Sequence, residues 1–474
     1  MSPLASAPFL AVFAGWCAGL SVTTRFPPIA VSLVGTLFSA AFLLVCTRRF
    51  PAGSEIFFPS LLLLVAIPLV FLAWRIQQPC PGERSYEGEA TVTAERSWGG
   101  KRAVVLSTPE GSLLCLMGPE NMVVEGLKLR VAGQVVRLET LFPGLKEGEF
   151  DPSRYWRGKG VYQGFRQCRV NVLEPPGAQK VSWRTSLRRK LLLSLMPLVR
   201  GHLLAAWAGE KDPEVAKLHQ RWGTAHLLAV SGFHVGILAA VVLWCLNGFR
   251  FKLLWGSVLL WGYVFLTGGA ASACRAMAMI QLALLGPVVA GRPSSGVNSV
   301  SVAGGALLLV NPWLFWDTGW RLSVVSALVL CSIVGRRSRS LNAVGASFAV
   351  WLATAGEASR VFGAVPLAGL LLNLIALPFF SFVLPVASIA VLPALAGVPG
   401  GWVPMLGAES LLEAWVKIAT LACRVMPWQV SYTPLLWNLS AGVIGAAVGF
   451  GLKIGWSRGI LLFLLAGSSG LVFH

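Results

Sequence analysis

Apolar segments long enough to cross a bilayer recur along this chain and leave few alternatives to a membrane protein. A helix needs about 20 apolar residues to span the hydrocarbon core. Hydrophobic residues make up 55% of the 474 residues, and charged residues only 12%. The candidate segments are 8–24, 29–47, 56–74, 224–248, 253–271, 274–291, 298–315, 320–335, 341–358, 361–380, 381–398, 402–424, 432–451 and 455–473. Several are short or interrupted by glycine or proline, so we expect a polytopic α-helical membrane protein with roughly ten to thirteen spans.

One charged block, residues 83–182, interrupts this pattern. It contains 14 basic and 12 acidic residues, frequent glycine, and alternating stretches such as 89–94 and 127–132. Short runs of period two between turn residues predict a small all-β soluble domain. The block carries only +2 of the chain's net charge of +19, so the excess positive charge lies in membrane loops and helix ends.

Basic residues that follow several apolar segments predict the orientation of the chain. They are Arg48, Arg49, Arg250, Lys252, Arg292, Arg336, Arg337 and Arg339. The positive-inside rule prefers such residues in the cytoplasm. This orientation places the β domain on the extracytoplasmic face and the apolar segments in the lipid bilayer.

Two cysteines of the β domain, Cys115 and Cys168, leave two interpretations open. An oxidising exterior permits a disulfide bridge between them. Alternatively, both are small buried strand residues of a reduced protein. None of the nine cysteines forms a Cys-x-x-Cys pair, so we expect no structural zinc site.

Residues 223–235, GTAHLLAVSGFHV, place polar groups inside a membrane-length apolar run. Such groups need a partner or a water-filled cavity. If the segment is one helix, His226 and His234 lie about 80° apart on one broad face, with Ser231 between them. If the helix breaks at Ser231 and Gly232, its backbone amides can face phosphate oxygens. A third interpretation is a structural hydrogen-bond network between packed helices.

Together with residues 209–218, this segment resembles the signature of the ComEC family, the inner-membrane proteins of natural transformation. Further matches follow in the family's order: SACRAMAM at 272–279, Asn311-Pro312, residues 317–323 and LNLIALP at 372–378. The β domain resembles the family's OB-like domain through residues 148–155 and 160–161. The resemblance covers most of residues 83–380. It implies a channel that imports single-stranded DNA across the bacterial cytoplasmic (inner) membrane.

The chain departs from the family in two ways. Arg321 stands where the family usually has glutamine, and the chain resembles a short form without the metallo-β-lactamase-like domain of larger members. Its five histidines form no His-x-His-x-Asp-His arrangement, and no Gly-x-Ser-x-Gly turn surrounds Ser231. We therefore expect no enzymatic activity, no cofactor and no metal ion. The sequence contains no Gly-x-x-x-x-Gly-Lys-Ser/Thr loop, so a motor is expected to act in trans.

Polar residues of the matching segments form the candidate DNA path or structural seam. Arg275 and Arg321 can attract a polyanion, but both stand near the start of an apolar segment and can instead snorkel to the interface. Asp317 precedes Arg321 by one helical turn, so the two can form an ion pair. The amide of Asn373 more often bonds a neighbouring helix than a ligand. The candidate residues are His226, Ser231, Gly232, His234, Arg275, Asp317, Gly319, Arg321, Ser323 and Asn373.

A second candidate site for DNA lies in the β domain, where residues 154–166 read RYWRGKGVYQGFR. Rings can stack on bases while cations follow the backbone of a single strand. The alternative is that aromatic residues on strands fill the core of a small barrel. The candidate residues are Arg154, Tyr155, Trp156, Arg157, Lys159, Tyr162 and Arg166.

We divide the chain into four parts. These are N-terminal transmembrane helices (1–82), an extracytoplasmic OB-like β domain (83–182), an amphipathic interfacial connector (183–222) and a competence-type transmembrane core (223–474). The implied partners are single-stranded DNA, a DNA-receptor protein, a helicase-like motor and a separate nuclease. Two other functions stay open: a transporter of another anionic solute, and an inactive membrane scaffold for envelope or competence partners.

Overall fold

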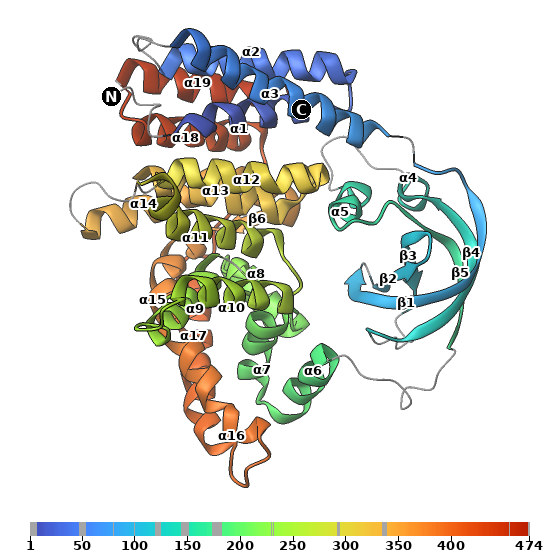
Figure 1. Ribbon diagram of the computed structural model, residues 1–474. Coiled ribbons are helices and arrows are strands. Elements are labelled where there is room, and N and C mark those ends of the chain that lie inside the picture. The colour runs from blue at the N-terminus through green and yellow to red at the C-terminus, as the bar shows by residue number, and fades with distance from the viewer. Residues whose placement is uncertain are drawn as a thin grey trace. The chain divides into compact units, whose positions relative to one another are not determined.

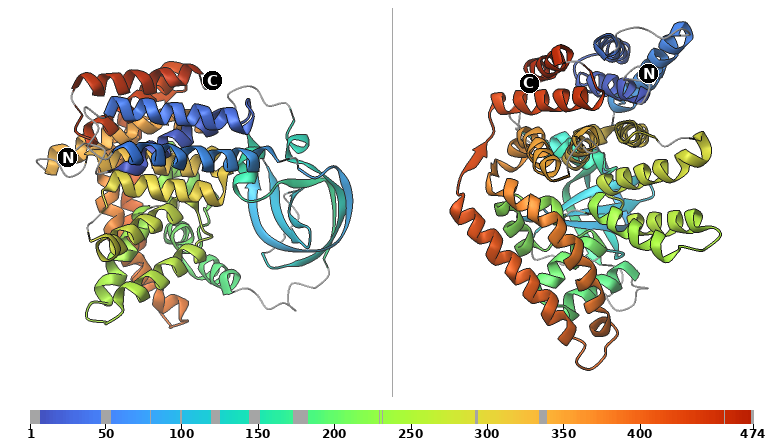
Figure 2. Two further views of the ribbon diagram at one scale, coloured as in Figure 1. Left: turned by 45° about the horizontal axis from the view of Figure 1, so that its top comes forward. Right: turned by 90° about the vertical axis from the view of Figure 1, so that its left-hand side faces the viewer.

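The chain contains two compact units, each described by itself. The computed structural model describes residues 7–46, 54–78, 80–98, 100–118, 125–143, 151–172, 183–228, 230, 232–291, 294–333, 339–454 and 456–472. The helical unit comprises Met1–Ile76 and Leu191–His474, and the barrel unit comprises Gln77–Lys190. Figures 1 and 2 show both units in three views. The expected combination of a mostly helical chain with a small inserted β domain is confirmed.

The barrel unit is a closed five-stranded β-barrel (Figure 1). Its strands are β1 (Arg84–Trp98), β2 (Lys101–Thr108), β3 (Gly111–Met117), β4 (Lys128–Arg137) and β5 (Gln163–Val172). They follow the order β1-β2-β3-β5-β4, and β1 pairs with β4 to close the barrel. Strands β3 and β5 run parallel, whereas the other neighbours run antiparallel. Two short helices, α4 (Leu138–Leu141) and α5 (Pro152–Gly158), lie between β4 and β5 in the chain.

Alternating side chains explain how the strands close around a core. In β4, Leu129 and Val131 are buried, whereas Lys128 and Arg130 are exposed. Phe165 of β5 joins the same hydrophobic cluster. Burying a side chain of this size stabilises the fold by about 1.5–3 kcal/mol. The interior is therefore a packed core, and the charged side chains lie on the outer face.

The helical unit begins with three helices, continues after the barrel, and contains one small sheet. Helix α6 (Trp183–Ser194) crosses the boundary between the units in the sequence. The other elements are α1 (Pro8–Ser21), α2 (Pro28–Cys46), α3 (Ser54–Gln77), α7 (Pro197–Leu203), η2 (Leu204–Ala208), α8 (Pro213–Trp222), η3 (Ala225–Leu228), α9 (Gly232–Cys245), α10 (Lys252–Leu266), α11 (Ala271–Ala290), α12 (Gly296–Val310), η4 (Pro312–Trp316), α13 (Thr318–Ile333), α14 (Arg339–Phe362), β6 (Ala364–Pro366), α15 (Ala368–Ala390), α16 (Leu392–Leu395), α17 (Val403–Val425), β7 (Gln429–Ser431), α18 (Pro434–Gly451) and α19 (Trp456–Val472). Strands β6 and β7 pair in antiparallel orientation.

Five helical stretches among the described residues are long and apolar enough to cross a bilayer. They are Pro28–Cys46, Pro59–Gln77, Ala271–Val288, Ala368–Leu395 and Pro434–Gly451. Shorter apolar helices of 14 to 16 residues are α1, α9, α10, α12 and α13. The segments expected at 361–380 and 381–398 are not two separate spans, because α15 runs continuously through Pro378 and Pro385. Neighbouring helices and local adjustments can satisfy the backbone groups that a proline frees in such a helix.

The first and the last helices of the chain share one hydrophobic core. Figures 1 and 2 show α1–α3 beside α18 and α19. Phe13 of α1, Leu69 of α3 and Leu462 of α19 belong to one buried cluster, which also includes side chains of α12 and α13. The helices on both sides of the barrel insertion therefore fold together.

Local sequence explains where several helices begin. Asp151, Asp212, Asn311 and Thr433 each accept hydrogen bonds from backbone amides of the following turn. Each of these residues is followed by a proline, whose fixed φ suits the first helical position. This pairing sets the starts of α5, α8, η4 and α18.

Candidate functional site

The segment at 223–235 is broken and does not form one helix. Helix α8 ends at Trp222, η3 covers residues 225–228, and α9 begins at Gly232. His226 and His234 therefore do not share a helix, and the prediction of a common helical face is wrong. A helix start at Gly232 is the part of the second interpretation that the structure contains; that its amides face phosphate oxygens stays a prediction. Ser231 lies outside the described residues.

Glycine is required where α8 ends. Gly223 has φ +73°, a conformation that a residue with a side chain adopts at a cost. A Cβ at this position would lie 3.1 Å from the Cα of Gly369 at the start of α15. The two glycines therefore let the end of α8 pack directly against the backbone of α15.

Arg275 of α11 is where three of the matching segments meet. Its Nε donates a hydrogen bond to Ser323 Oγ of α13 at 2.9 Å. Its Nη2 lies against the first residue of α9, because a Cβ on Gly232 would be 3.2 Å from it. Ser272 Oγ also donates to Val230 O at 2.7 Å, which ties α11 to the residues before α9. We call Gly232, Arg275 and Ser323 the Arg275 cluster.

The Arg275 guanidinium is buried without a carboxylate partner. The residue is 7% exposed, and its Nη1 donates to the Met279 sulfur at 2.9 Å. No carboxylate of the described part of the chain lies within 4 Å of it. Burying an unpaired cation is costly, and a thioether is only a weak acceptor. The cluster is thus a positively charged site whose counter-charge is not supplied by the described residues.

Arg321 has a different environment, because it pairs with a carboxylate. Its Nη1 lies 3.0 Å from Glu357 Oε1 of α14, and Arg360 approaches the same oxygen at 3.3 Å. Its Nε donates to Phe315 O at 2.8 Å, and its guanidinium lies over the Phe315 ring. The ion pair of Arg321 is therefore formed with Glu357 and not with Asp317.

Two further candidates, Asp317 and Gly319, lie at the start of α13, and a third, Asn373, lies inside α15. Asp317 Oδ1 accepts a hydrogen bond from Trp320 N at 2.8 Å and so caps the start of α13. A Cβ on Gly319 would lie 3.0 Å from this oxygen. Asn373 lies inside α15, and its buried Oδ1 has no hydrogen-bond partner. Among the described residues, no donor of a neighbouring helix reaches this oxygen, although the amide was expected to bond such a helix.

The described histidines include a buried pair, His202 and His219, that the sequence did not indicate. His226 is exposed and His234 is buried. His202 and His219 are also buried, and their Nε2 atoms lie 3.2 Å apart. His202 Nδ1 donates to Leu198 O at 2.7 Å, and Thr224 Oγ1 lies 2.9 Å from His219 Nδ1. A chain of hydrogen bonds therefore links α7 through α8 to the residue that follows Gly223.

The aromatic and basic residues at 154–166 do not form one surface. Trp156 is 1% exposed and belongs to a second buried cluster, with Val105 of β2 and Leu138 of α4, so the prediction that it stacks on a base does not fit this structure. Tyr155 packs against Trp98, with ring centroids 5.3 Å apart. Arg154 pairs with Asp151, and Arg157 pairs with Glu139. Arg154 and Arg157 lie in helix α5, whereas the sequence suggested strands for this segment.

The remaining members of this segment are exposed. They are Lys159, whose Nζ lies 5.5 Å from the centre of the Tyr155 ring, Tyr162 and Arg166. Arg169 on β5 is exposed as well, although the sequence did not single it out. In this part of the barrel unit, the exposed side chains that can contact a phosphate backbone are therefore few.

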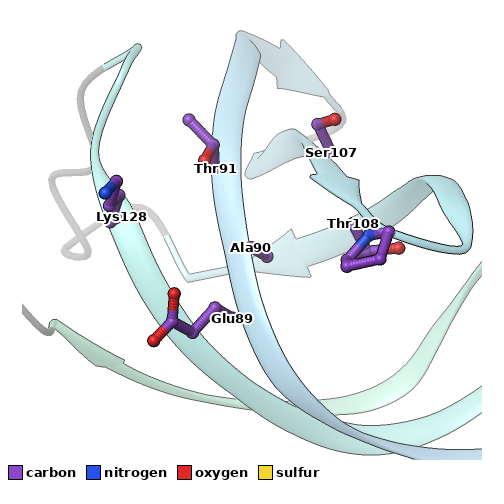
Figure 3. Close-up of a pocket in the computed structure, with 7 residues that line it drawn as sticks. Glu89, Ala90, Thr91, Ser107, Thr108 and Lys128 are labelled. Atoms are coloured by element: carbon purple, nitrogen blue, oxygen red, sulfur yellow. The ribbon is translucent and has the colours of Figure 1, made fainter.

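The barrel unit also has a shallow hollow of about 330 Å³ (Figure 3). It is lined by Glu89, Ala90, Thr91, Ser107, Thr108, Pro109 and Lys128. None of the residues predicted to bind DNA lines it, and its charges have opposite signs. It therefore offers no clear preference for an anion.

Cys115 and Cys168 are free thiols that belong to the same barrel core. A hydrogen bond with Cys168, together with burial, raises the pKa of the Cys115 thiol. The disulfide between them stays a prediction. Among the residues that the structure describes, no three His, Cys, Asp or Glu side chains form a group able to hold a metal ion.

The helical unit, which contains the Arg275 cluster, is similar to known proteins. The family model described as "Competence protein" matches residues 203–457, more than half of the chain. ComE operon protein 3 of Bacillus subtilis (strain 168) is 29% identical over 201 residues, which cover 40% of this chain and 26% of that protein. Protein YcaI of Escherichia coli (strain K12), described as uncharacterized, is 25% identical over 357 residues, which cover 63% of this chain and 44% of YcaI. The matches thus span less than half of either relative, and no solved structure matches the chain.

Proposed function

Because the chain belongs to the competence protein (ComEC) family, we propose that it carries a single strand of DNA across the bacterial cytoplasmic membrane during the uptake of external DNA. A polyanion can cross a bilayer only along a hydrated path that offers hydrogen-bond donors and positive charge. The matched region contains seven of the apolar helices described above as shorter or candidate spans, together with the Arg275 cluster. These features support transport rather than a soluble role.

The Arg275 cluster is the observation that carries this proposal. Residues from α9, α11 and α13, which lie far apart in the sequence, converge on one buried cation. A cation without a carboxylate inside a helical membrane protein is costly, and such residues mark the paths of ions and substrates. An anionic cargo that passes this point would supply the missing charge.

We also propose how the chain is oriented in the membrane. The chain has roughly ten to thirteen spans, with its basic loops in the cytoplasm and the OB-like barrel on the extracytoplasmic face. There the barrel meets incoming DNA through Tyr162, Arg166 and Arg169, which are exposed on or beside β5. Arginine and tyrosine side chains suit this role because they contact phosphates and bases without sequence preference.

The chain acts in this proposal as a channel and not as an enzyme. The driving force comes from a helicase-like motor, external DNA is delivered by a receptor protein, and any strand degradation is carried out by a nuclease site outside residues 1–474. The sequence contains no phosphate-binding loop of the NTPase type, which agrees with a motor in trans.

The test is a transformation assay in a clean deletion strain that is complemented by this chain. We expect transformation and the uptake of labelled DNA into a nuclease-protected state to be lost in the deletion and restored by the wild-type chain. Arg275→Gln should restore neither at equal membrane abundance, whereas Arg424→Gln, at an exposed position of α17, should restore both.

Three results would reject DNA import. Transformation that persists in the deletion strain would remove the basis of the proposal. Normal uptake of protected DNA without the chain, combined with loss of another anionic solute, would favour the alternative transporter. Normal transport of both by a strain that lacks the chain would favour a scaffold.

A further inference from the structure

We infer that the start of α9, the Arg275 guanidinium and the Ser323 hydroxyl form a binding site for one phosphodiester group. The inference rests on the proposed function and names a step of it: the point at which a single phosphate of the moving strand is held.

The helix terminus supplies hydrogen-bond donors. Helix α9 has 14 residues, and its first amides, from Gly232 onward, have no acceptor within the helix. The helix macrodipole places partial positive charge at this end, which makes it suitable for an anion. Helix α9 begins at Gly232, and the Arg275 guanidinium lies against this first residue.

The charge of Arg275 matches one phosphodiester. Its side chain lies beside this terminus and is 7% exposed, without a carboxylate among the described residues within 4 Å. Its Nε and Nη1 contact Ser323 and Met279, whereas Nη2 has no acceptor in the described part of the chain. Ser323 Oγ accepts from Nε, so its own hydrogen can be donated to a ligand. A phosphodiester carries one negative charge and would neutralise the single guanidinium.

The Arg275 guanidinium can approach α9 this closely because residue 232 is glycine. A Cβ there would lie 3.2 Å from Nη2 and 3.3 Å from the Cβ of Ala276. A methyl group would therefore push against the guanidinium without changing any charge. Gly236, one turn later on the same helix, is exposed and has open space where a Cβ would be. The two glycines form a matched pair for an experiment.

Arg321 does not form a second site of this kind. Its guanidinium already has Glu357 as a partner at 3.0 Å. The distinction between the two arginines is therefore made by the structure, because both stand near the start of an apolar segment in the sequence.

The experiment measures the binding of a labelled single-stranded oligothymidylate to the purified full chain in detergent micelles, by fluorescence anisotropy at several salt concentrations. Losing a hydrogen bond to a charged group should weaken binding by Arg275→Gln about 10- to 100-fold. The slope of log K against log salt should fall by about 0.7, which corresponds to one phosphate contact on a single strand. Gly232→Ala should weaken binding with little change in slope, and Gly236→Ala should bind as the wild type does.

Further probes separate the sources of a phosphodiester. An oligothymidylate with uncharged methylphosphonate linkages should not compete for the site, whereas the natural oligonucleotide should. If phosphatidylglycerol stabilises the wild type but not Arg275→Gln, while DNA binding is equal for the two, the site belongs to lipid and the inference is overturned. Equal binding of DNA by the wild type, Arg275→Gln and Gly232→Ala would overturn it as well.

The outcome can be separated from that of the proposed function. If the deletion strain loses transformation but Arg275→Gln restores it fully, the phosphodiester site fails and DNA import stands. If the deletion strain transforms normally, DNA import fails regardless of what the purified chain binds.

Discussion

Replacing Glu357 by glutamine should strongly destabilise the helical unit. The Glu357 carboxylate lies 3.0 and 3.2 Å from Arg321 Nη1 and 3.3 Å from Arg360 Nη2. The side chain of Glu357 is 9% exposed, and those of the two arginines are 21% and 29% exposed. Glu357→Gln removes the negative charge and leaves two partly buried cations close to each other.

The size of the effect follows from this burial. Removing one partner of a buried ion pair costs about 3–5 kcal/mol, because the remaining charge is left without compensation. Arg321 and Arg360 are partly exposed, so water screens their charges. We therefore expect the lower end of this range, a loss of about 3 kcal/mol in unfolding free energy. This corresponds to a change of roughly 100-fold in the unfolding equilibrium.

The assay is equilibrium unfolding of the full chain in mixed detergent micelles, arranged as a double-mutant cycle. Arg321→Met alone should also destabilise, whereas the double variant Arg321→Met/Glu357→Gln should cost less than the sum of the two singles. Glu413→Gln, at an exposed position of α17, should change the unfolding free energy by no more than about 0.5 kcal/mol. Strict additivity of Arg321→Met and Glu357→Gln would refute the assignment of Glu357 as the partner of Arg321.

Three further predictions concern local contacts. Gly223→Ala should cost about 1–3 kcal/mol in unfolding free energy, because residue 223 has φ +73° and its Cβ would press on Gly369; an unchanged unfolding midpoint would contradict this packing. Asp212→Ala should cost about 1 kcal/mol, since its carboxylate caps α8 through Glu214 N and Val215 N, and Asp212→Asn should recover most of the loss. Cys115 in the reduced protein should react with a maleimide far more slowly at pH 8 than the exposed Cys245, because burial and the Cys168 hydrogen bond raise the pKa of its thiol; equal rates would show that Cys115 is not buried.

The sequence predicted the helical segments and the β insert because each of these patterns involves only residues that are near one another in the chain. The change from apolar runs to alternating, charged stretches located the β insert, since strands and membrane helices bury their side chains with different periods. The positions of Asp212 and Asn311 before a proline likewise predict helix starts that the structure contains. The number of spans was harder to predict, since Pro378 and Pro385 look like breaks but lie inside α15.

The pairing of side chains depended on contacts that the sequence does not encode locally. Glu357 lies 36 positions after Arg321, on another helix. One feature could have indicated it: it is an acidic residue inside the apolar segment 341–358, and ionisable residues in such segments pair with one another. The contact between His202 and His219 had no comparable indication, because it depends on how α7, η2 and α8 turn.

The residues at 154–166 show why composition alone did not locate a DNA-binding surface. Mixed aromatic and basic residues fit both a binding face and a barrel core. Because residues 152–158 form a helix, Tyr155 and Trp156 point to different sides from those that a strand would give. Trp156 is then buried against Val105 and Leu138, and the exposed Arg166 and Arg169 lie further along, on β5.

The arginine at position 321, where the family resemblance leads one to expect glutamine, need not disturb the Arg275 cluster. Arg321 and Ser323 are two residues apart on α13, which separates their side chains by about 200° around the helix axis. Ser323 can therefore face Arg275 of α11 while Arg321 faces Glu357 of α14. A carboxylate at 3.0 Å holds the second guanidinium on the opposite side of the helix. Glu357 therefore neutralises the additional charge of Arg321. The charge of Arg275 remains available for an incoming anion.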